Sequence, residues 1–175
     1  VEASLSGSGA ACVRQMPQLG TGHAIQQVLP LLPDDDSTVL ILNGDVPLIR
    51  EGTARALAAA CGGHELALLT IELDDPAGYG RIVRNSDGDV EAIVEEKDAS
   101  PAQRDIREIS SGILAFDAEF LLGALPRLGT DNAKGELYLT DLVGLAREDG
   151  LTVGAHVIED VMQTEGANDR AQLAE

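Results

Sequence analysis

The chain has 175 residues, of which 44% are hydrophobic and 2% aromatic, and it contains no tryptophan. A chain of this length can bury a core as a single domain, built here mainly from aliphatic side chains. The formal net charge of −18 argues against a nucleic-acid partner, because contacts with nucleic-acid phosphates need a basic surface. The sequence has no apolar run that could span a bilayer and no basic-then-apolar leader, so we expect no membrane association.

The two cysteines, Cys12 and Cys61, show neither the CxxC spacing of redox motifs nor a zinc-ligand pattern. Isolated thiols of cytosolic proteins stay reduced and are usually buried. We therefore expect two reduced, buried cysteines and a cytoplasmic location.

The first part of the chain alternates predicted strands with predicted helices. Ala11–Gln15 is predicted as a short strand, and Thr21–Leu32 as a helix with apolar residues at helical spacing. Thr38–Leu42 is a continuous apolar run, typical of a strand buried on both faces of a parallel sheet. An alanine-rich helix at Glu51–Ala60 and a second buried strand at Glu65–Leu73 follow.

The middle of the chain predicts an antiparallel hairpin, because Asn85-Ser86-Asp87-Gly88 separates two alternating segments. Further elements follow the hairpin: a buried strand at Ser111–Phe116, a helix that Asp117 caps and that runs to about Leu125, a helix at Tyr138–Asp149, a strand at Leu151–Ile158 and a terminal helix at Asn168–Ala174. This alternation predicts an α/β, Rossmann-like layered fold with a mainly parallel sheet and one inserted antiparallel hairpin. Ligands of such sheets bind outside the carboxyl ends of the strands.

The stretch Gln18–Ala24, QLGTGHA, places two glycines at the mouth of a predicted helix. One interpretation is a flexible turn in which a threonine caps the helix. The other is a site where the backbone approaches a ligand closely, with the N–H groups near Gly20, Thr21 and Gly22 directed at an anion or a base edge. His23 lies in the first helical turn, where positive charge is disfavoured, so we expect a neutral structural histidine.

Asn43-Gly44-Asp45 directly follows the apolar run Thr38–Leu42. A carboxylate at the end of a buried strand is well placed to hold a divalent cation, and its hard oxygens suit Mg²⁺. Gly44 would let a ligand ring lie against bare backbone. The alternative is that Asp45 only stabilises the turn before Pro47.

Basic residues are scarce, with 12 Lys and Arg against 30 Asp and Glu, so the position of each one is informative. Lys97 and Arg81 lie near the predicted loops, and either could meet a phosphate. The alternative is surface pairing with Glu96 or Asp98, which stabilises little. Glu95 ends an apolar strand and could accept hydrogen bonds from sugar hydroxyls, although an exposed acid at a strand end is common.

Several motifs occur in one order along the chain: QLGTGHA, NGDVPL, LDDPAGYGRIVR, IVEEKDA, the pair EISSG and GELYLTD, and EGANDRAQL. In these motifs and their gaps the chain resembles the uridylyltransferase domain of the GlmU family, the bacterial bifunctional N-acetylglucosamine-1-phosphate uridylyltransferase / glucosamine-1-phosphate N-acetyltransferase enzymes. The resemblance extends from about Ala11 to Glu175, and GYGR and GELYLTD are its most specific motifs. It implies the nucleotide-diphospho-sugar transferase type of fold.

The resemblance also implies roles for individual residues. The family's uracil-binding residues fall on Gln15, Gly20 and Thr21, and we add Asn43 and Gly44 to these nucleotide-binding candidates. Its Mg²⁺ ligands fall on Asp45 and Asn168, and we add Lys97 to Asp45 as a catalytic candidate. Its sugar-binding positions fall on Gly80, Glu95, Ser110, Tyr138 and Thr140.

The chain departs from the family pattern at Ser110, where the family usually has Asn, and at Asn43, where an aromatic or small residue is common. The family's N-terminal strand and its LAAGxGTRM loop, which holds the triphosphate, have no counterpart before Ala11. The β-helix that carries acetyl transfer and forms trimers in the family is also absent. We therefore expect residues 1–175 to be an internal part of the uridylyltransferase domain, inactive alone, from a parent enzyme that is a homotrimer.

The activity implied by the resemblance is transfer of a uridylyl group from UTP to N-acetylglucosamine 1-phosphate. The products are pyrophosphate and UDP-N-acetylglucosamine, a precursor of peptidoglycan and lipopolysaccharide. Two alternatives stay open: a nucleotidyltransferase for another sugar, such as glucose 1-phosphate, and a non-catalytic assembly or regulatory module. Asp45 and Asn168 argue against the non-catalytic alternative, whereas the missing phosphate loop argues for it.

Overall fold

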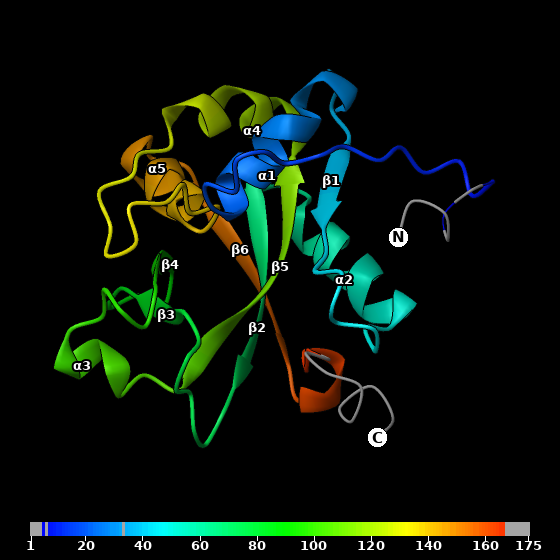
Figure 1. Ribbon diagram of the computed structural model, residues 1–175. Coiled ribbons are helices and arrows are strands. Elements are labelled where there is room, and N and C mark those ends of the chain that lie inside the picture. Colours follow the sequence, from blue (N-terminus) through cyan, green and yellow to red (C-terminus); the bar gives the residue numbers. More distant parts are fainter. Residues whose placement is uncertain (1–4, 6, 33, 167–175) are drawn as a thin grey trace.

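A computed structural model describes residue 5 and residues 7–32 and 34–166, and in this part of the chain six strands form one sheet (Figure 1). The strand order is β4-β3-β5-β2-β6, and β1 pairs with β5 beside this path. The strands are β1 (Thr38–Ile41), β2 (Leu66–Glu72), β3 (Arg81–Arg84), β4 (Val90–Val94), β5 (Glu108–Asp117) and β6 (Val153–Ile158).

The ten-residue strand β5 organises the sheet. Strand β2 runs antiparallel along one edge of β5, while β1 and β3 share its other edge, pairing with its last and first residues respectively. Only β2 and β6 pair in parallel. The prediction of a mainly parallel sheet was therefore wrong. Strands β1 and β2 do point the same way, but the antiparallel β5 lies between them, and a strand–helix alternation does not reveal such an insertion.

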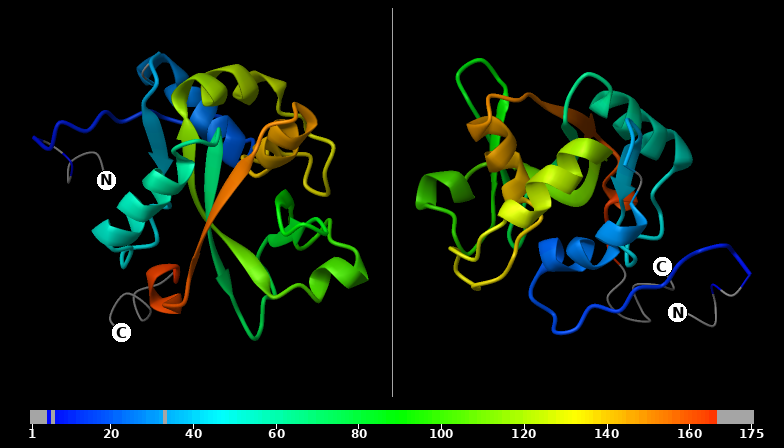
Figure 2. Two further views of the ribbon diagram at one scale, coloured as in Figure 1. Left: turned by 180° about the vertical axis from the view of Figure 1, so that it is seen from behind. Right: turned by 90° about the horizontal axis from the view of Figure 1, so that it is seen from above.

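Helices cover both faces of the sheet (Figures 1 and 2). Helix α2 (Glu51–Cys61) packs on one face, where its Leu57 joins Ala67, Leu69 and Ile71 of β2. Helices α4 (Ala118–Ala124) and α5 (Asp141–Glu148) pack on the other face against a second core cluster. Alternate residues of β2 thus enter different cores, which confirms the prediction of a strand buried on both faces.

Strand β1 was predicted to be buried on both faces, and this prediction was wrong. Thr38 and Leu40 are exposed, and only Val39 and Ile41 pack toward the core. Successive side chains of a strand point to opposite faces, so β1 is covered on one face only. Among the strands of the described residues it pairs with β5 alone, so its second edge is open as well. Leu40 is 36% exposed and Leu42 is 48% exposed along this edge.

The local helix signals were accurate for α2 and α4. The Asp117 side chain accepts a hydrogen bond from the N–H of Phe120 at 2.9 Å, as its predicted capping role requires. The hairpin was also confirmed, because β3 and β4 pair antiparallel around Asn85–Gly88. The short helix α3 (Pro101–Arg104) was not predicted, although Ser100 and Gln103 form the capping box that marks its start.

Other boundaries differ from the predictions. Ala11–Gln15 has no strand pairing. Helix α1 spans Thr21–Val28 and gives way to the 3₁₀ turn η2 (Leu29–Leu31), because Pro30 cannot continue the α-helical hydrogen bonds. Helix α5 begins three residues after Tyr138. Two more 3₁₀ turns are η3 (Leu125–Arg127) and η4 (Val161–Gln163), and the predicted terminal helix Asn168–Ala174 lies outside the described residues.

The two cysteines differ in their surroundings. Cys61 is buried as predicted, whereas Cys12 is exposed, because the segment that carries it forms no part of the sheet. Burial raises the pKa of the Cys61 thiol, and the nearby carboxylates of Asp117 and Glu65 raise it further. Within the described ranges, none of the helices is both long and apolar enough to cross a membrane.

Candidate active site

The QLGTGHA stretch is bound to the GELYLTD segment, although more than a hundred residues separate them. The N–H of Leu137 donates to Leu19 O at 2.8 Å, and the N–H of Gly22 donates to Leu137 O at 2.8 Å. The Thr21 hydroxyl oxygen accepts a third bond from the N–H of Leu139 at 3.0 Å. The start of α1 and the segment before α5 are thereby fixed to one another.

This contact explains the first glycine of the stretch. Gly20 has φ of 111°, and a Cβ built there would lie 2.9 Å from Leu137 N and still closer to Leu137 O. At Gly22 a Cβ would lie 2.5 Å from the Leu128 side chain and 3.1 Å from Leu137 O. The two glycines therefore permit a close approach of the backbone, but what they approach is the segment at Leu137 of the same chain. Gly20 also serves as the N-cap residue, and Thr21 begins the helix.

Gln15 points at the same turn. Its amide nitrogen donates to Gly20 O at 2.9 Å and lies 3.2 Å from His23 Nδ1. Gln27, one helical turn after His23, contacts the other ring nitrogen at 3.2 Å. Gln15, Gly20 and Thr21 are thus brought together at the N-terminus of α1, and their nucleotide-binding role stays a prediction.

The Asn43-Gly44-Asp45 turn leaves β1 at its carboxyl end, as predicted. The Asn43 side chain donates to Ser111 O at 3.3 Å and packs against Gly112, where a Cβ would lie 2.7 Å from Asn43 Nδ2. Gly44 is open to solvent and Asp45 is exposed. Gly166 lies beside Asp45, since a Cβ on it would be 3.5 Å from Asp45 Oδ2.

The sugar-binding candidates form a second group at the base of the hairpin. A Cβ on Gly80 would lie 3.4 Å from Glu95 Oε1, so these two residues are in contact. The Thr140 hydroxyl donates to the same Glu95 oxygen at 3.1 Å. The N–H of Ser110 donates to Gly80 O at 2.9 Å. Four of the five candidates are thus linked in one chain of contacts.

The segment Ser110–Gly112 joins the two groups. Ser110 bonds to Gly80 on the sugar side, and Ser111 accepts the Asn43 amide on the nucleotide side. Ser111 also donates its hydroxyl to Leu69 O at 2.7 Å, which holds the segment to β2. Ser110 was named as a candidate from the sequence, but Ser111 and Gly112 were missed. The signal was available, because two serines and a glycine at the start of a strand predicted to be buried are unusual.

Tyr138, the fifth sugar-binding candidate, lines a cavity of about 140 Å³ with Gly78, Glu95, Glu96, Lys97 and Lys134. Tyr138 is only 6% exposed, and its hydroxyl has no hydrogen-bond partner in the described residues. Burial raises the pKa of Tyr138, and the carboxylates of Asp98 and Glu95 raise it further. The group is therefore a neutral phenol that can donate a hydrogen bond to a ligand.

The surroundings of this cavity are acidic. Burial raises the pKa of Asp141, and the charges of Glu95 and Asp98 add to the increase. An anionic ligand here needs basic side chains to offset the carboxylates. Lys97 and Lys134 provide them, and they are the only two lysines in the sequence. Lys134 was not among the sequence candidates, although this rarity was a usable signal.

Arg81 does not belong to this set. Its side chain is 2% exposed, its Nη2 lies 2.7 Å from Glu96 Oε2, and it donates to the carbonyls of Tyr79 and Arg104. A buried guanidinium that is bound to the half-buried carboxylate of Glu96 and to two carbonyls is not free to meet a phosphate. Of the two interpretations offered for Arg81, pairing with Glu96 is confirmed, but the expectation of a surface pair was wrong, because the Arg81 side chain is buried.

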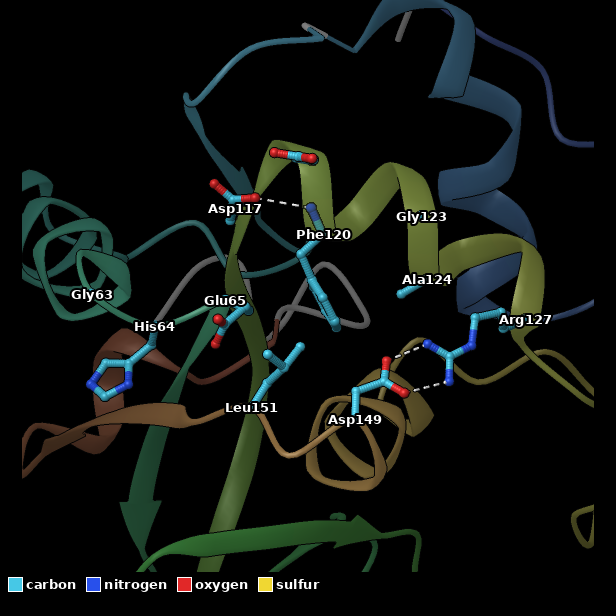
Figure 3. Close-up of a pocket in the computed structure, with 11 residues that line it drawn as sticks. Gly63, His64, Glu65, Asp117, Phe120, Gly123, Ala124, Arg127, Asp149 and Leu151 are labelled. Atoms are coloured by element: carbon cyan, nitrogen blue, oxygen red, sulfur yellow. Dashed lines mark hydrogen bonds and ion pairs between the residues drawn. The ribbon is translucent and has the colours of Figure 1, made fainter.

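A larger cavity of about 700 Å³ lies elsewhere, where Glu65 precedes β2 and Leu151 precedes β6 (Figure 3). This is the amino end of those parallel strands, whereas the Asn43-Gly44-Asp45 turn leaves β1, which points the same way as β2, at its carboxyl end. Its one arginine, Arg127, is paired with Asp149, with Nη2 3.0 Å from Oδ1 (Figure 3). The lining therefore offers no unpaired arginine or lysine for a phosphorylated ligand.

Of the two predicted Mg²⁺ ligands, Asp45 lies within the described residues. Asp45 is exposed, and its carboxylate oxygens suit a cation that retains several waters. The described part of the chain contains no group of three or more His, Cys, Asp or Glu side chains arranged to hold a metal ion. Asn168, the second predicted ligand, lies outside the described residues.

Curated relatives match nearly the whole chain. The Bifunctional protein GlmU of Paracidovorax citrulli (strain AAC00-1) is 61% identical over 164 residues, which are 94% of this chain and 34% of that protein. The protein of the same name from Acidovorax sp. (strain JS42) is 53% identical over 182 residues, or 100% of this chain and 38% of the relative. The protein of the same name from Corynebacterium efficiens is 53% identical over 163 residues, which are 92% of this chain and 34% of that relative.

These matches confirm the resemblance to GlmU proteins, and the chain spans about a third of the length of the relatives. The sequence model of the family described as "Nucleotidyl transferase" matches residues 4–161. Because that match extends over most of the chain, the chain belongs to the nucleotidyl transferase family.

Proposed function

We propose that this chain is part of an enzyme that transfers a uridylyl group from UTP to N-acetylglucosamine 1-phosphate. The observation that carries the proposal is the segment Ser110–Gly112, which joins the Asn43 turn to the group formed by Gly80 and Glu95. A nucleotide side and a sugar side connected by one rigid strand segment suit a reaction between two bound substrates. The identity to GlmU proteins supports the same reaction.

On the sugar side, Glu95 would accept hydrogen bonds from sugar hydroxyls. Its Oε1 already accepts from Thr140, which orients the carboxylate and leaves Oε2 for the ligand. Tyr138 would donate its hydroxyl, which has no hydrogen-bond partner in the described residues, and Gly80 would contact the sugar through its backbone beside Glu95. Ser110 has a shorter side chain than the Asn of the family, so its contact with the sugar would run through water.

On the nucleotide side, Gln15 and the turn at Gly20 and Thr21 would contact the uracil, with Asn43 and Gly44 beside it. Asp45 and Asn168 would hold Mg²⁺. Gly166 supports the role of Asp45 and Asn168 as a pair, because it lies beside Asp45 and Asn168 follows it two residues later in the sequence. Mg²⁺ would supply charge neutralisation for the phosphates when bound.

The reaction would proceed by in-line displacement. A phosphate oxygen of the sugar 1-phosphate attacks the α-phosphorus of UTP, the bond from that phosphorus to the bridging oxygen breaks, and pyrophosphate leaves with the electron pair. No covalent intermediate with the chain is needed, so the residues of the chain would position the two substrates and neutralise the charge of their phosphates. Lys97 would contact the attacking phosphate. We also propose that the parent enzyme is a cytoplasmic homotrimer.

The proposal is tested with the extended chain, meaning this chain preceded by the glycine-rich segment that begins the family's uridylyltransferase domain. Pyrophosphate release from UTP is measured with N-acetylglucosamine 1-phosphate and with glucose 1-phosphate. We expect release with the first sugar and loss of release in Glu95→Gln. Equal rates with both sugars would contradict the sugar assignment, and no release with either would favour the non-catalytic alternative.

A further inference from the structure

Lys97 and Lys134, the only lysines of a chain with net charge −18, line the same cavity of about 140 Å³. Both side chains are exposed, and neither makes an ion pair within the described residues. By contrast, seven of the arginines in the described chain are paired with carboxylates. The amines of Lys97 and Lys134 are therefore basic groups of this cavity that form no ion pair within the described residues.

The loop that carries Lys134 (yellow in Figure 1) is held in place. The N–H of Ala133 donates to Asp98 Oδ1 at 2.7 Å, which ties this loop to the segment that carries Lys97. Asn132 fixes the loop from within, because its side chain donates to Glu136 O at 2.6 Å and accepts from the N–H of Lys134 at 3.2 Å. The Lys134 amine lies 5.8 Å from the centre of the Tyr138 ring.

The charges of the cavity give the two lysines a function. The charge of Glu96 is already balanced by Arg81, 2.7 Å away. The charged lining residues that remain are Glu95, Lys97 and Lys134. Among the lining residues alone, Lys97, Lys134 and Glu95 give one net positive charge, and loss of Lys134 gives none. The carboxylates of Asp98 and Asp141 lie near Tyr138 and add negative charge, so an anion needs both lysines. A cavity of about 140 Å³ is smaller than the roughly 300 Å³ at which pockets take a whole drug-sized ligand, so it would receive one end of the substrate.

We propose that Lys134 is a specificity-determining residue that, together with Lys97, binds the phosphate of the sugar 1-phosphate. The proposal rests on the proposed function, and it adds a contact with the sugar phosphate from Lys134, a residue outside the sequence motifs. Tyr138, 6% exposed and with a neutral hydroxyl that has no hydrogen-bond partner in the described residues, is a further polar residue in the lining of this cavity. Tyr138 also positions the Lys134 amine through its ring.

The test uses the extended chain and compares Lys134→Met with Lys134→Arg. Methionine retains an apolar stem over the Tyr138 ring and removes the charge, whereas arginine retains the charge. Arg55→Met is the matched control, because it removes one positive charge from an exposed pair on α2. Binding of N-acetylglucosamine 1-phosphate, N-acetylglucosamine and UTP is measured by calorimetry, and KM and kcat are measured for the sugar phosphate.

We expect Lys134→Met to weaken binding of the sugar phosphate about tenfold, as for one lost charge-assisted hydrogen bond. Its KM should rise more than kcat falls, with binding of the unphosphorylated sugar and of UTP unchanged, and Lys134→Arg should restore most of the affinity. Sugar-phosphate binding that stays at the wild-type level in Lys134→Met, or a loss confined to UTP, would overturn the assignment of Lys134 while leaving the proposed function standing. A wild-type extended chain that binds none of the ligands would overturn both proposals.

Discussion

The amide of Gly22 donates a hydrogen bond to the carbonyl of Leu137 at 2.8 Å, across 115 residues of sequence. This bond places the turn proposed to contact uracil against the segment that carries Tyr138 and Thr140, both proposed to contact sugar. The nucleotide side and the sugar side are therefore coupled at α1 as well as at Ser110–Gly112.

This coupling predicts that replacing Gly20 lowers the stability of the fold. Replacement by Ala would strain a backbone at φ 111° and press the new Cβ against Leu137, so we expect the free energy of unfolding to fall by about 3 kcal/mol. Gly150→Ala is the control, because Gly150 has φ 75° but nothing within 4 Å, and should lose only about 1 kcal/mol. Urea unfolding of the 175-residue chain measures both. Equal losses would show that the contact with Leu137 is not tight.

Asp45 is predicted to be a Mg²⁺ ligand. Asp45→Asn in the extended chain should weaken Mg²⁺ binding in calorimetry and cut turnover by at least about a hundredfold, because an amide supplies no negative charge to the cation. The unfolding temperature should not change, since Asp45 is exposed. Asp105→Asn, an equal change at another exposed acid, should leave turnover intact. Normal turnover of Asp45→Asn at saturating Mg²⁺ would rule out this ligand.

Gln15 is predicted to select uracil over cytosine. Gln15→Ala removes the amide that borders the turn at Gly20, so the ratio of kcat/KM for UTP to that for CTP should fall about tenfold. Gln27→Ala also removes an amide that contacts His23, but from the following helical turn, and should leave the ratio unchanged. If the ratio stays constant in both variants, Gln15 has a structural role only.

Glu108, the first residue of β5, forms an ion pair with Arg84, with Oε1 2.6 Å from Nη2. Burial favours the protonated acid, but the bonds from Arg84 and Thr70 outweigh it, so the pKa of Glu108 is below its ordinary value of 4.5. A carboxyl whose pKa is lowered by folding stabilises the fold above its unfolded pKa and loses this contribution as the pH falls through the folded pKa.

Glu108→Gln should therefore lower the free energy of unfolding by about 1–2 kcal/mol at pH 7, with the difference from wild type shrinking below about pH 4.5. The range is modest because Arg84 is 30% exposed. Glu51→Gln, which breaks the exposed pair with Arg55, should change little at any pH. A Glu108→Gln difference that grows on acidification would have the wrong sign for this linkage.

The open edge of β1 predicts self-association of the 175-residue chain. Exposed Leu40 lies on a strand whose second edge has no partner in the described residues, and such edges pair with other chains. Leu40→Lys should shift sedimentation toward the monomer, whereas Leu31→Lys, the same change at a 59% exposed site away from the sheet, should not. A wild-type chain that is monomeric at all concentrations would refute the prediction.

Local chemistry alone determined much of this protein. The Asp117 cap, the Asn85–Gly88 hairpin and helix α2 depend on neighbouring residues, so the sequence predicted them. The same applies to the exit of Asn43-Gly44-Asp45 from a strand, because an apolar run followed by turn residues is a local signal. The resemblance to GlmU proteins likewise rested on motifs that are contiguous in sequence.

Tertiary structure decided what depends on distant partners. The direction of β5 between β1 and β2, and hence the exposed edge of β1, follows from strand pairing that no local pattern encodes. Arg81 and Lys134 are both basic residues in polar surroundings, yet Arg81 is buried against Glu96 while Lys134 faces a cavity. The glycines of QLGTGHA accommodate Leu137, because the fold brings a backbone from 115 residues away to within hydrogen-bonding distance.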